Sequence, residues 1–302
     1  MLDLNIIVEN YLGYCEYQKK LSDKTLKAYK IDLNQFIQCM HKNNMEVNRY
    51  NLTSFITQLH KKFKPKTAKR KIASLKAFFY YLEYEEFIDE NPFNKIKVKF
   101  QEPSLLPRII SIENLQKIFK TAYQNRAENL EDKTIMRDIA VLELLFATGM
   151  RVSELCALKQ DEIDFKAGTI LIYGKGAKER IVHITNKNVL KAILQYNKGY
   201  RSEQKASQYL FINRLGGRLS EQSVRFMIKR YTELAGIKEK ITPHMFRHTF
   251  ATLLLEEDVD IRYIQQILGH SSIMTTQIYT HVTIKKQREI LTTRHPRNRI
   301  RV

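Results

Sequence analysis

Cysteine, long apolar runs and acidic residues are scarce in this chain of 302 residues. Its three cysteines, Cys15, Cys39 and Cys156, are widely spaced without a Cys-x-x-Cys pair, which argues against a disulfide framework or a cysteine zinc site. The longest apolar stretch, residues 139–150, contains Glu143 and falls well short of the roughly 20 residues that a membrane span needs. The acidic N-terminus has no small-residue cleavage site, so we expect a protein that stays in the reducing cytoplasm.

The shortage of acidic residues leaves a strong positive charge. Lys and Arg number 51 against 32 Asp and Glu, giving a net charge of +19 at pH 7. A hydrophobic content of 43% is enough to build real cores, which excludes a wholly disordered basic protein. Self-repulsion of this size is tolerated most easily when the partner is a polyanion. We therefore expect about two folded domains and a nucleic-acid partner, with an acidic membrane surface as the second candidate.

The first part of the chain has a helical pattern. Apolar residues recur at helical spacing from Leu4 to about Ile88, which predicts about four helices with an N-cap at Ser22. In the segment 65–82 one face is apolar, and cations surround the rest: Lys66, Lys69, Arg70 and Lys76. Such a helix can follow a DNA phosphate backbone, although a solvated helix face is the alternative.

Three of the six prolines, Pro92, Pro103 and Pro107, fall in one region with little periodic pattern. We therefore predict a helical DNA-binding domain over residues 1–96, an extended linker over 97–110, and a second domain over 111–302. The second domain is expected to contain helices capped at Ser111, Ser220, Thr242 and Ser271, and one ending at Gly149. A β-hairpin is predicted from residues 169–173 and 179–184. The expected fold class is mainly α with a small antiparallel β-sheet in the second domain.

Four clusters in the second domain combine cations with groups that handle protons. Arg151 follows a glycine turn just before a helix, and Lys175 lies between glycines at the hairpin tip. His244 and Arg247 share a face near a helix N-terminus, which favours anions. His270 follows the helix end at Gly269, and Tyr279 comes about two turns later. Taken singly, Arg151, Lys175 and Tyr279 are each more typical of an ordinary residue than of a catalytic one.

The third cluster also contains a pair of histidines that a metal ion could use. His248 lies four residues after His244, the spacing of a helical metal pair. The pair lacks the Glu of the zinc-protease pattern, and Arg247 stands beside it. We therefore expect no metal, with His248 as a hydrogen-bonded packing residue.

The order Arg, Lys, His-x-x-Arg, His, Tyr closely resembles the tyrosine site-specific recombinases, or phage integrase family. The segments ATGMRVSEL, GKGAKER, HMFRHTFAT, LGHSS and TTQIYTH resemble that family's motifs, most closely those of the Xer subgroup, and they cover most of residues 147–281. The helices containing SDKTLKAYKIDLNQF and KTAKRKIASLKAFFYYL are similar to its core-binding domain. The resemblance implies a two-domain, C-shaped clamp around DNA.

By this resemblance, Arg151 and Arg247 would hold the non-bridging oxygens of a scissile phosphate, with hydrogen bonds from His244 and His270. Tyr279 would attack and form a 3′-phosphotyrosine, while Lys175 would protonate the departing 5′-oxygen. Glu154 is expected to orient its neighbours, and further DNA contacts are expected from the cations of residues 65–82 together with Lys178 and Arg180. Because the phosphotyrosine conserves the bond energy, neither ATP nor Mg²⁺ is expected.

The family also implies an assembly. Four protomers would act on DNA that carries a short inverted-repeat core site. A second recombinase or a DNA translocase is a candidate partner. The tail after Tyr279 would dock on a neighbouring protomer. A frayed basic terminus is the alternative for that tail. Within the family, we expect Xer-like resolution of chromosome or plasmid dimers, with a mobile-element integrase or transposon recombinase as the alternative. Three alternatives come from other functional classes: a catalytically silent DNA-binding protein, a type IB topoisomerase and a zinc hydrolase.

Overall fold

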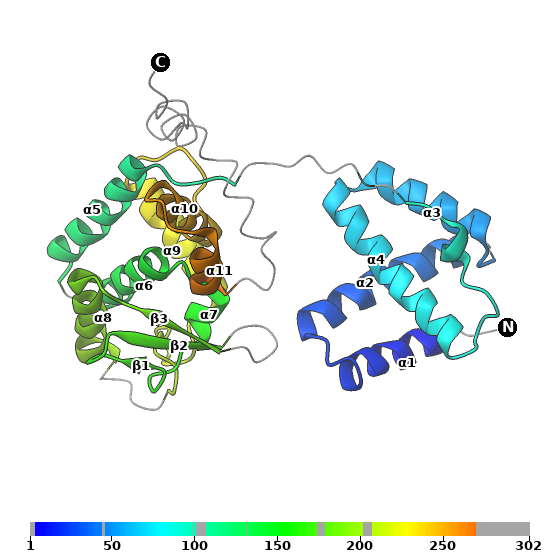
Figure 1. The fold of residues 1–302 in the computed structure, drawn as a ribbon, viewed down its shortest axis with the longest axis horizontal. Helices are drawn as coiled ribbons and strands as arrows, with labels where there is room; N and C mark the ends of the chain where they lie inside the picture. The colour runs from blue at the N-terminus through cyan, green and yellow to red at the C-terminus, as the bar shows by residue number, and fades with distance from the viewer. Residues whose placement is uncertain are drawn as a thin grey trace, which may run out of the picture. The chain divides into compact units, whose positions relative to one another are not determined.

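The computed structural model describes residues 4–43, 46–98, 100, 107–130, 132–173, 179–201 and 207–269. Contacts divide the chain into two compact units, Met1–Ser104 and Leu105–Val302, each with its own hydrophobic core (Figure 1). Val98 and Phe100 pack against the core of the first unit, and Ile110 belongs to the core of the second. Residues from both ends of the expected linker therefore pack on a core, while the boundaries drawn from the sequence stay predictions.

The first unit consists of four helices and a short 3₁₀ segment. They are α1 (Leu4–Tyr17), α2 (Asp23–Lys42), α3 (Arg49–Lys62), α4 (Pro65–Tyr84) and η1 (Pro92–Lys95). The expected helices are confirmed, and the hydroxyl of Ser22 caps α2 by accepting from the backbone N–H of Thr25. Helix α4 contacts the other three, since its apolar stripe is buried as the spacing predicts.

A buried ion-pair network joins α2 to α4. The carboxylate of Asp32, which is 1% exposed, accepts from Lys71 Nζ at 2.8 Å and from Ser74 Oγ at 3.2 Å, and it also pairs with Arg70. A buried carboxylate is tolerated only when it is paired in this way. The network therefore fixes the helix that presents the predicted DNA-binding cations.

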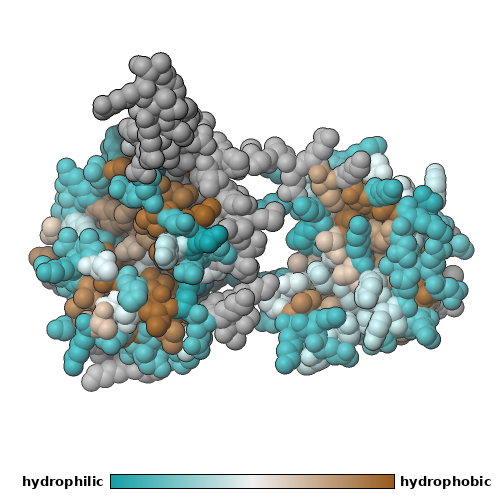
Figure 2. Space-filling view, viewed as in Figure 1, coloured by the Kyte–Doolittle hydropathy of each residue, from teal (hydrophilic) through white to brown (hydrophobic). Residues whose placement is uncertain are grey.

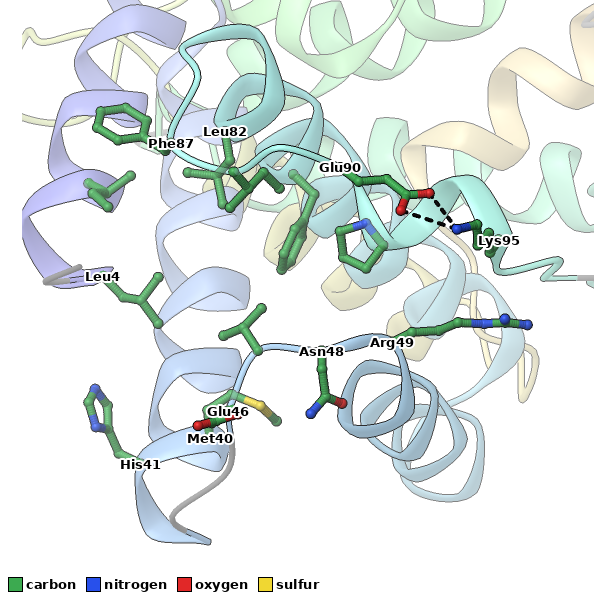
Figure 3. A pocket seen from close by; sticks show the side chains of 15 residues that line it. Leu4, Met40, His41, Glu46, Asn48, Arg49, Leu82, Phe87, Glu90 and Lys95 are labelled. Carbon is green, nitrogen blue, oxygen red and sulfur yellow. Dashed lines mark hydrogen bonds and ion pairs between the residues drawn. The ribbon is translucent and has the colours of Figure 1, made fainter. Parts of the chain in front are cut away.

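A cavity of about 800 Å³ opens in the first unit (Figure 3). It lies among α1, the end of α2, the start of α3 and the segment after α4, where Glu90 pairs with Lys95 at 2.7 Å. Apolar side chains such as Leu4 and Met40 line much of it. None of the residues predicted to be catalytic lines this cavity, and all of them belong to the second unit.

The second unit wraps helices around one central helix. In chain order its elements are α5 (Ile112–Glu128), α6 (Thr134–Thr148), α7 (Val152–Ala157), β1 (Ile163–Asp164), β2 (Thr169–Tyr173), β3 (Glu179–His183), α8 (Lys187–Gly199), α9 (Glu221–Leu234), α10 (Pro243–Glu256) and α11 (Ile261–Leu268). The central helix α6 is largely buried and contacts α5, α8, α9 and α10 (Figure 1). The three strands form an antiparallel sheet in the order β1-β2-β3, with Tyr173 opposite Glu179. The predicted fold class is confirmed.

Most of the local expectations for this unit are confirmed. Ser111 and Ser220 cap α5 and α9 through their side chains. Thr242 stands at the N-cap of α10 but makes no side-chain cap hydrogen bond. Strand β1 and helix α8 were not predicted, and the expected cap at Ser271 lies outside the described residues.

The visible surface of both units is largely hydrophilic, with apolar patches between the polar side chains (Figure 2). Within the described ranges, every helix is too short or too polar to cross a bilayer.

Candidate functional site

Three helix ends meet beside the first predicted arginine. Helix α6 ends at Gly149, whose φ of +59° is left-handed, and α7 begins two residues later with Arg151 at its N-cap. A Cβ atom at position 149 would lie 2.5 Å from Phe250 Cδ1 on α10 and 2.9 Å from Leu268 Cδ2 on α11. Glycine is needed here for two reasons, because the backbone is left-handed and because two other helices approach it closely.

The guanidinium of Arg247 holds these ends together. Helix α10 starts with Pro243 at its first turn, and Arg247 on it is only 4% exposed. Its Nη1 donates to the carbonyl oxygen of Gly149 at 2.8 Å, and its Nη2 donates to that of Leu268 at 2.7 Å. The carbonyls at helix C-termini lack helical partners and carry partial negative charge, so a buried cation stabilises both ends. Arg247 therefore links the segment before Arg151 to the end of α11.

Arg151 and Glu154 form a reciprocal pair at the start of α7. The backbone N–H of Arg151 donates to Glu154 Oε2 at 2.8 Å, and Arg151 Nη1 donates to Glu154 Oε1 at 2.8 Å. The Arg151 side chain remains 37% exposed, so a ligand can reach it. Glu154 therefore holds the Arg151 side chain in one orientation, while the supporting role of Glu154 in the reaction stays a prediction.

Glu154 also binds Arg180 on β3. Arg180 Nη1 and Nη2 donate to Glu154 Oε1 and Oε2 at 3.1 and 2.7 Å, and Arg180 Nε donates to the carbonyl oxygen of Ile267 at 3.1 Å. Burial raises the pKa of Glu154, but the hydrogen bonds and charges of Arg180 and Arg151 outweigh burial and leave that pKa below its usual value. Glu154 is therefore ionised at neutral pH. Arg180, expected from the sequence to contact DNA, directs all three nitrogens of its guanidinium inward.

Two histidines of α10 lie beside the arginines. Loss of solvation, and then the charges of Arg247, Arg225 and Arg151, lowers the pKa of His244. Loss of solvation, and then His244 and Arg247, lowers the pKa of His248. Both imidazoles are therefore neutral at pH 7, and His244 offers a hydrogen-bonding group without adding a further cation. Met245 and Phe246 between them are buried, as predicted.

Arg225, on α9, was not predicted from the sequence as a site residue. Its charge acts on His244, as the lowered pKa of that imidazole indicates. One signal in the sequence could have suggested Arg225 as a site residue: it is a cation in the first two turns of the helix that follows the N-cap Ser220.

The predicted DNA-binding cations of α4 differ in their surroundings. Lys66, Lys69 and Lys76 are exposed. Lys69 lies 6.0 Å from the ring centre of Phe100, and Lys76 lies 5.8 Å from that of Phe93. Arg70 pairs with the buried Asp32 while 45% of its side chain remains exposed.

Four of the predicted site residues lie outside the described residues: Lys175, Lys178, His270 and Tyr279. The structure thus brings together Arg151, Glu154, His244 and Arg247, while the roles of all these residues stay predictions. Across the part of the chain that the structure describes, no three His, Cys, Asp or Glu side chains gather where they could hold a metal ion. The thiols of Cys15 and Cys156 are buried, and that of Cys39 is half-buried.

Known proteins match both units. Residues 109–286 match the model of the phage integrase family, and residues 8–86 match that of the phage integrase N-terminal SAM-like domain. A tyrosine recombinase of Agathobacter rectalis is 49% identical over 98% of this chain and 98% of its own. Tyrosine recombinase XerC of Thermodesulfovibrio yellowstonii is 38% identical, again over 98% of both chains.

Solved structures agree with these matches. The crystal structure of XerA recombinase is 31% identical, with a TM-score of 0.55 over 99% of this chain and 100% of that one. The structure of XerH recombinase in a post-cleavage complex with its difH substrate is 24% identical with a TM-score of 0.75, covering 95% of this chain and 83% of that one, and shows the same fold. With both units matched and a relative nearly half identical along its whole length, this chain belongs to the phage integrase family, as a tyrosine recombinase of the Xer subgroup.

Proposed function

We propose that this recombinase performs its strand cleavage with Arg151, Lys175, His244, Arg247, His270 and Tyr279, and that it resolves chromosome or plasmid dimers. As a tyrosine recombinase of the Xer subgroup, the chain cleaves and rejoins DNA strands in site-specific recombination. The relatives named XerC support the dimer-resolving role.

One observation carries the proposed site. The buried guanidinium of Arg247 donates to the carbonyls of Gly149 and Leu268, which stand two residues before Arg151 and two before His270. The same guanidinium thus fixes the backbone shortly before Arg151 and shortly before His270 in the chain. Positioned cations stabilise the equatorial oxygens of a transferring phosphoryl group, which is the main requirement of this chemistry.

In the proposed reaction, the phenolic oxygen of Tyr279 forms a bond to phosphorus while the bond from phosphorus to the 5′-oxygen breaks. The departing oxygen takes a proton from Lys175, and the phenol gives its own proton to water, so solvent can return a proton to Lys175. A phenol has a pKa near 10, so the positive charge of Arg151 and Arg247 favours the phenolate. Attack by a 5′-hydroxyl on the phosphotyrosine reverses the step, and no external energy source is consumed.

Both units are proposed to contact the DNA, the first unit through the exposed cations of α4. Core sites bound by structural relatives support DNA binding as such. The same proposal includes assembly into a tetramer on an inverted-repeat site and docking of the tail on a neighbouring protomer. It also includes a partner recombinase or translocase and a cytoplasmic location.

The test traps the covalent intermediate on genomic DNA. Protein and a Tyr279→Phe variant are mixed with fragmented DNA of the source cell, quenched in SDS, and the DNA that stays attached is sequenced. Adducts that require Tyr279 and map to one chromosomal or plasmid site are the expected result. Adducts at the ends of a mobile element would show that the protein is an integrase and not a dimer resolvase. Salt-sensitive DNA binding without adducts would contradict the proposed catalysis.

A further inference from the structure

Arg180 is the second guanidinium that joins separate elements at this site. Its Nε donates to the carbonyl of Ile267 in the last turn of α11, and its two terminal nitrogens donate to the two oxygens of Glu154 on α7. Only 11% of its side chain is exposed. Because these contacts satisfy one N–H of each nitrogen inside the protein, the geometry favours an internal role over the DNA contact expected from the sequence.

The close packing around Arg180 shows how tightly it is held. Gly269 ends α11 with a φ of +66°, and the absence of a side chain leaves room for Arg180. A Cβ atom there would lie 2.9 Å from both Cδ and Nη1 of Arg180. The arginine therefore lies against the backbone at the end of α11, where its charge also complements the unpaired carbonyls of the last helical turn.

Glu154 connects Arg180 to Arg151. The carboxylate accepts from both arginines, so its negative charge is shared between them. Without Arg180, the whole charge of the buried Glu154 would act on Arg151, and a carboxylate competes with a phosphate for the same guanidinium. The end of α11 would lose its anchor to α7 at the same time.

We infer that Arg180 is a positioning residue for strand cleavage: it shares the charge of Glu154, so that Arg151 stays available to the scissile phosphate, and it fixes the end of α11 relative to α7. This inference rests on the proposed role of Arg151. Arg180 acts through Glu154 and the backbone and does not touch the substrate.

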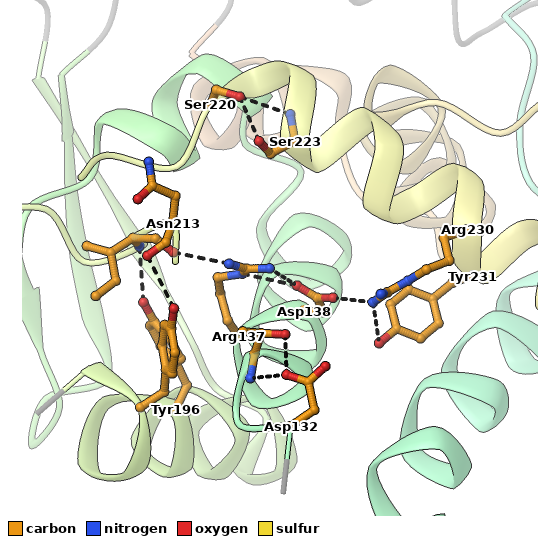
Figure 4. Close-up of polar contacts among 12 residues, drawn as sticks. Asp132, Arg137, Asp138, Tyr196, Asn213, Ser220, Ser223, Arg230 and Tyr231 are labelled. Carbon is orange, nitrogen blue, oxygen red and sulfur yellow. Dashed lines mark hydrogen bonds and ion pairs between the residues drawn. The ribbon is translucent and has the colours of Figure 1, made fainter. Parts of the chain in front are cut away.

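Another arginine of the same unit, about as exposed as Arg180, provides a matched control (Figure 4). Arg137, 13% exposed, donates to the buried Asp138 at 2.8 Å and to the carbonyl of Ile212 at 3.3 Å. Like Arg180, it joins one buried carboxylate to one backbone carbonyl. Asp138 also keeps a second partner, Arg230 at 2.6 Å, just as Glu154 keeps Arg151. Loss of Arg137 therefore imitates the structural cost of losing Arg180 without touching Glu154 or α11.

The experiment measures single-turnover formation of the covalent adduct on a nicked suicide substrate at saturating protein. Arg180→Gln is expected to slow adduct formation by about 10- to 100-fold, since small misplacements of a reacting group have effects of this size. Its DNA affinity is expected to stay near that of the unchanged protein. Arg137→Gln is expected to lower the melting temperature comparably but to leave the cleavage rate unchanged.

Two further variants separate positioning from a merely structural role. If Arg180 acts through Glu154, the double variant Glu154→Gln plus Arg180→Gln cleaves no more slowly than the slower of the two single variants. Arg180→Lys retains the charge but cannot reach all three acceptors, and we expect it to recover part of the rate lost in Arg180→Gln.

Four outcomes would overturn the inference. Arg180→Gln could cleave at the normal rate, Arg137→Gln could slow cleavage by the same factor, the two losses in the double variant could multiply, or Arg180→Gln could weaken only DNA affinity. In each of these, the unchanged protein still forms Tyr279-dependent adducts and the proposed function stands. Absence of such adducts from the unchanged protein would overturn the proposed function together with this inference.

Discussion

Arg247 combines two tasks in one buried side chain. Two of its donors are used on the helix-end carbonyls of Gly149 and Leu268, and its charge helps to keep the neighbouring His244 neutral. A guanidinium can do this because its donors point in fixed, divergent directions, whereas an ammonium is a single compact charge. We therefore expect stability and catalysis to depend on the same residue.

We predict that Arg247→Gln lowers the cleavage rate by about a hundredfold or more, the usual effect of losing one transition-state donor. The free energy of unfolding is expected to fall by about 1–3 kcal/mol, because buried carbonyls lose a donor. Single-turnover adduct formation and urea unfolding measure the two effects. A variant that is less stable but cleaves at the normal rate would show that Arg247 is only structural.

The lowered pKa values of His244 and His248 predict a pH dependence of stability. An unfolded histidine has a pKa near 6.5, and both folded values lie lower, so the unfolded state binds more protons at mildly acidic pH. The free energy of unfolding should therefore be fully retained above about pH 6.5 and fall as the pH drops below it. Urea unfolding between pH 5 and 8 measures the slope, which His248→Asn should reduce. An unchanged slope in that variant would contradict the assignment.

At the scale of elements, the end of α6 is packed closely against α10 and α11. Gly149→Ala is predicted to destabilise the second unit in two ways, through a left-handed backbone and through overlap with Phe250 and Leu268. Gly236→Ala is the matched control, since Gly236 has a φ of +67° but no atom within 4 Å of an added Cβ. Backbone strain of this kind costs on the order of 1 kcal/mol, and overpacking adds about 1–3 kcal/mol.

Thermal or urea unfolding of these two glycine variants isolates the packing contribution. Gly149→Ala should lose clearly more stability than Gly236→Ala. Equal losses in the two variants would mean that α10 and α11 do not press on the end of α6.

Element boundaries could be predicted where a local signal exists. The caps at Ser22, Ser111 and Ser220 and the left-handed Gly149 depend on neighbouring residues alone, and each is confirmed. Helix α8 was not predicted, although its buried residues recur at helical spacing: Val189, Ala192, Ile193 and Tyr196. Strand β1 has two residues, too few for any periodicity, and only its pairing with β2 defines it.

At the scale of the whole molecule, the positive charge predicts salt-sensitive DNA binding. Each phosphate contact releases counterions, so Lys66→Gln should weaken binding and reduce the slope of log affinity against log salt by about 1. Lys30 pairs with Glu9 at 2.8 Å in the same unit, and Lys30→Gln is the control that should leave the slope unchanged. Titrations from low to moderate salt measure both variants. Equal salt slopes for the two variants and the unchanged protein would show that Lys66 does not contact DNA phosphates.

The order of residues along the chain was sufficient to identify the family, because the spacing of Arg151, Lys175, His244 and Arg247 is itself the signal. The partners of Arg180 could not be predicted in this way. Its pair with Glu154 joins residues 26 positions apart, and its carbonyl partner is 87 positions away. A sequence shows a cation between strand residues, but only the fold shows that this cation faces inward.

The most direct test of the account is to locate the covalent bond to DNA. The protein is trapped on a suicide substrate, digested with protease and nuclease, and the peptide that carries the nucleotide remnant is sequenced by tandem mass spectrometry. The account predicts the remnant on Tyr279, in the peptide containing TTQIYTH. A remnant on a serine or on any other tyrosine would contradict it.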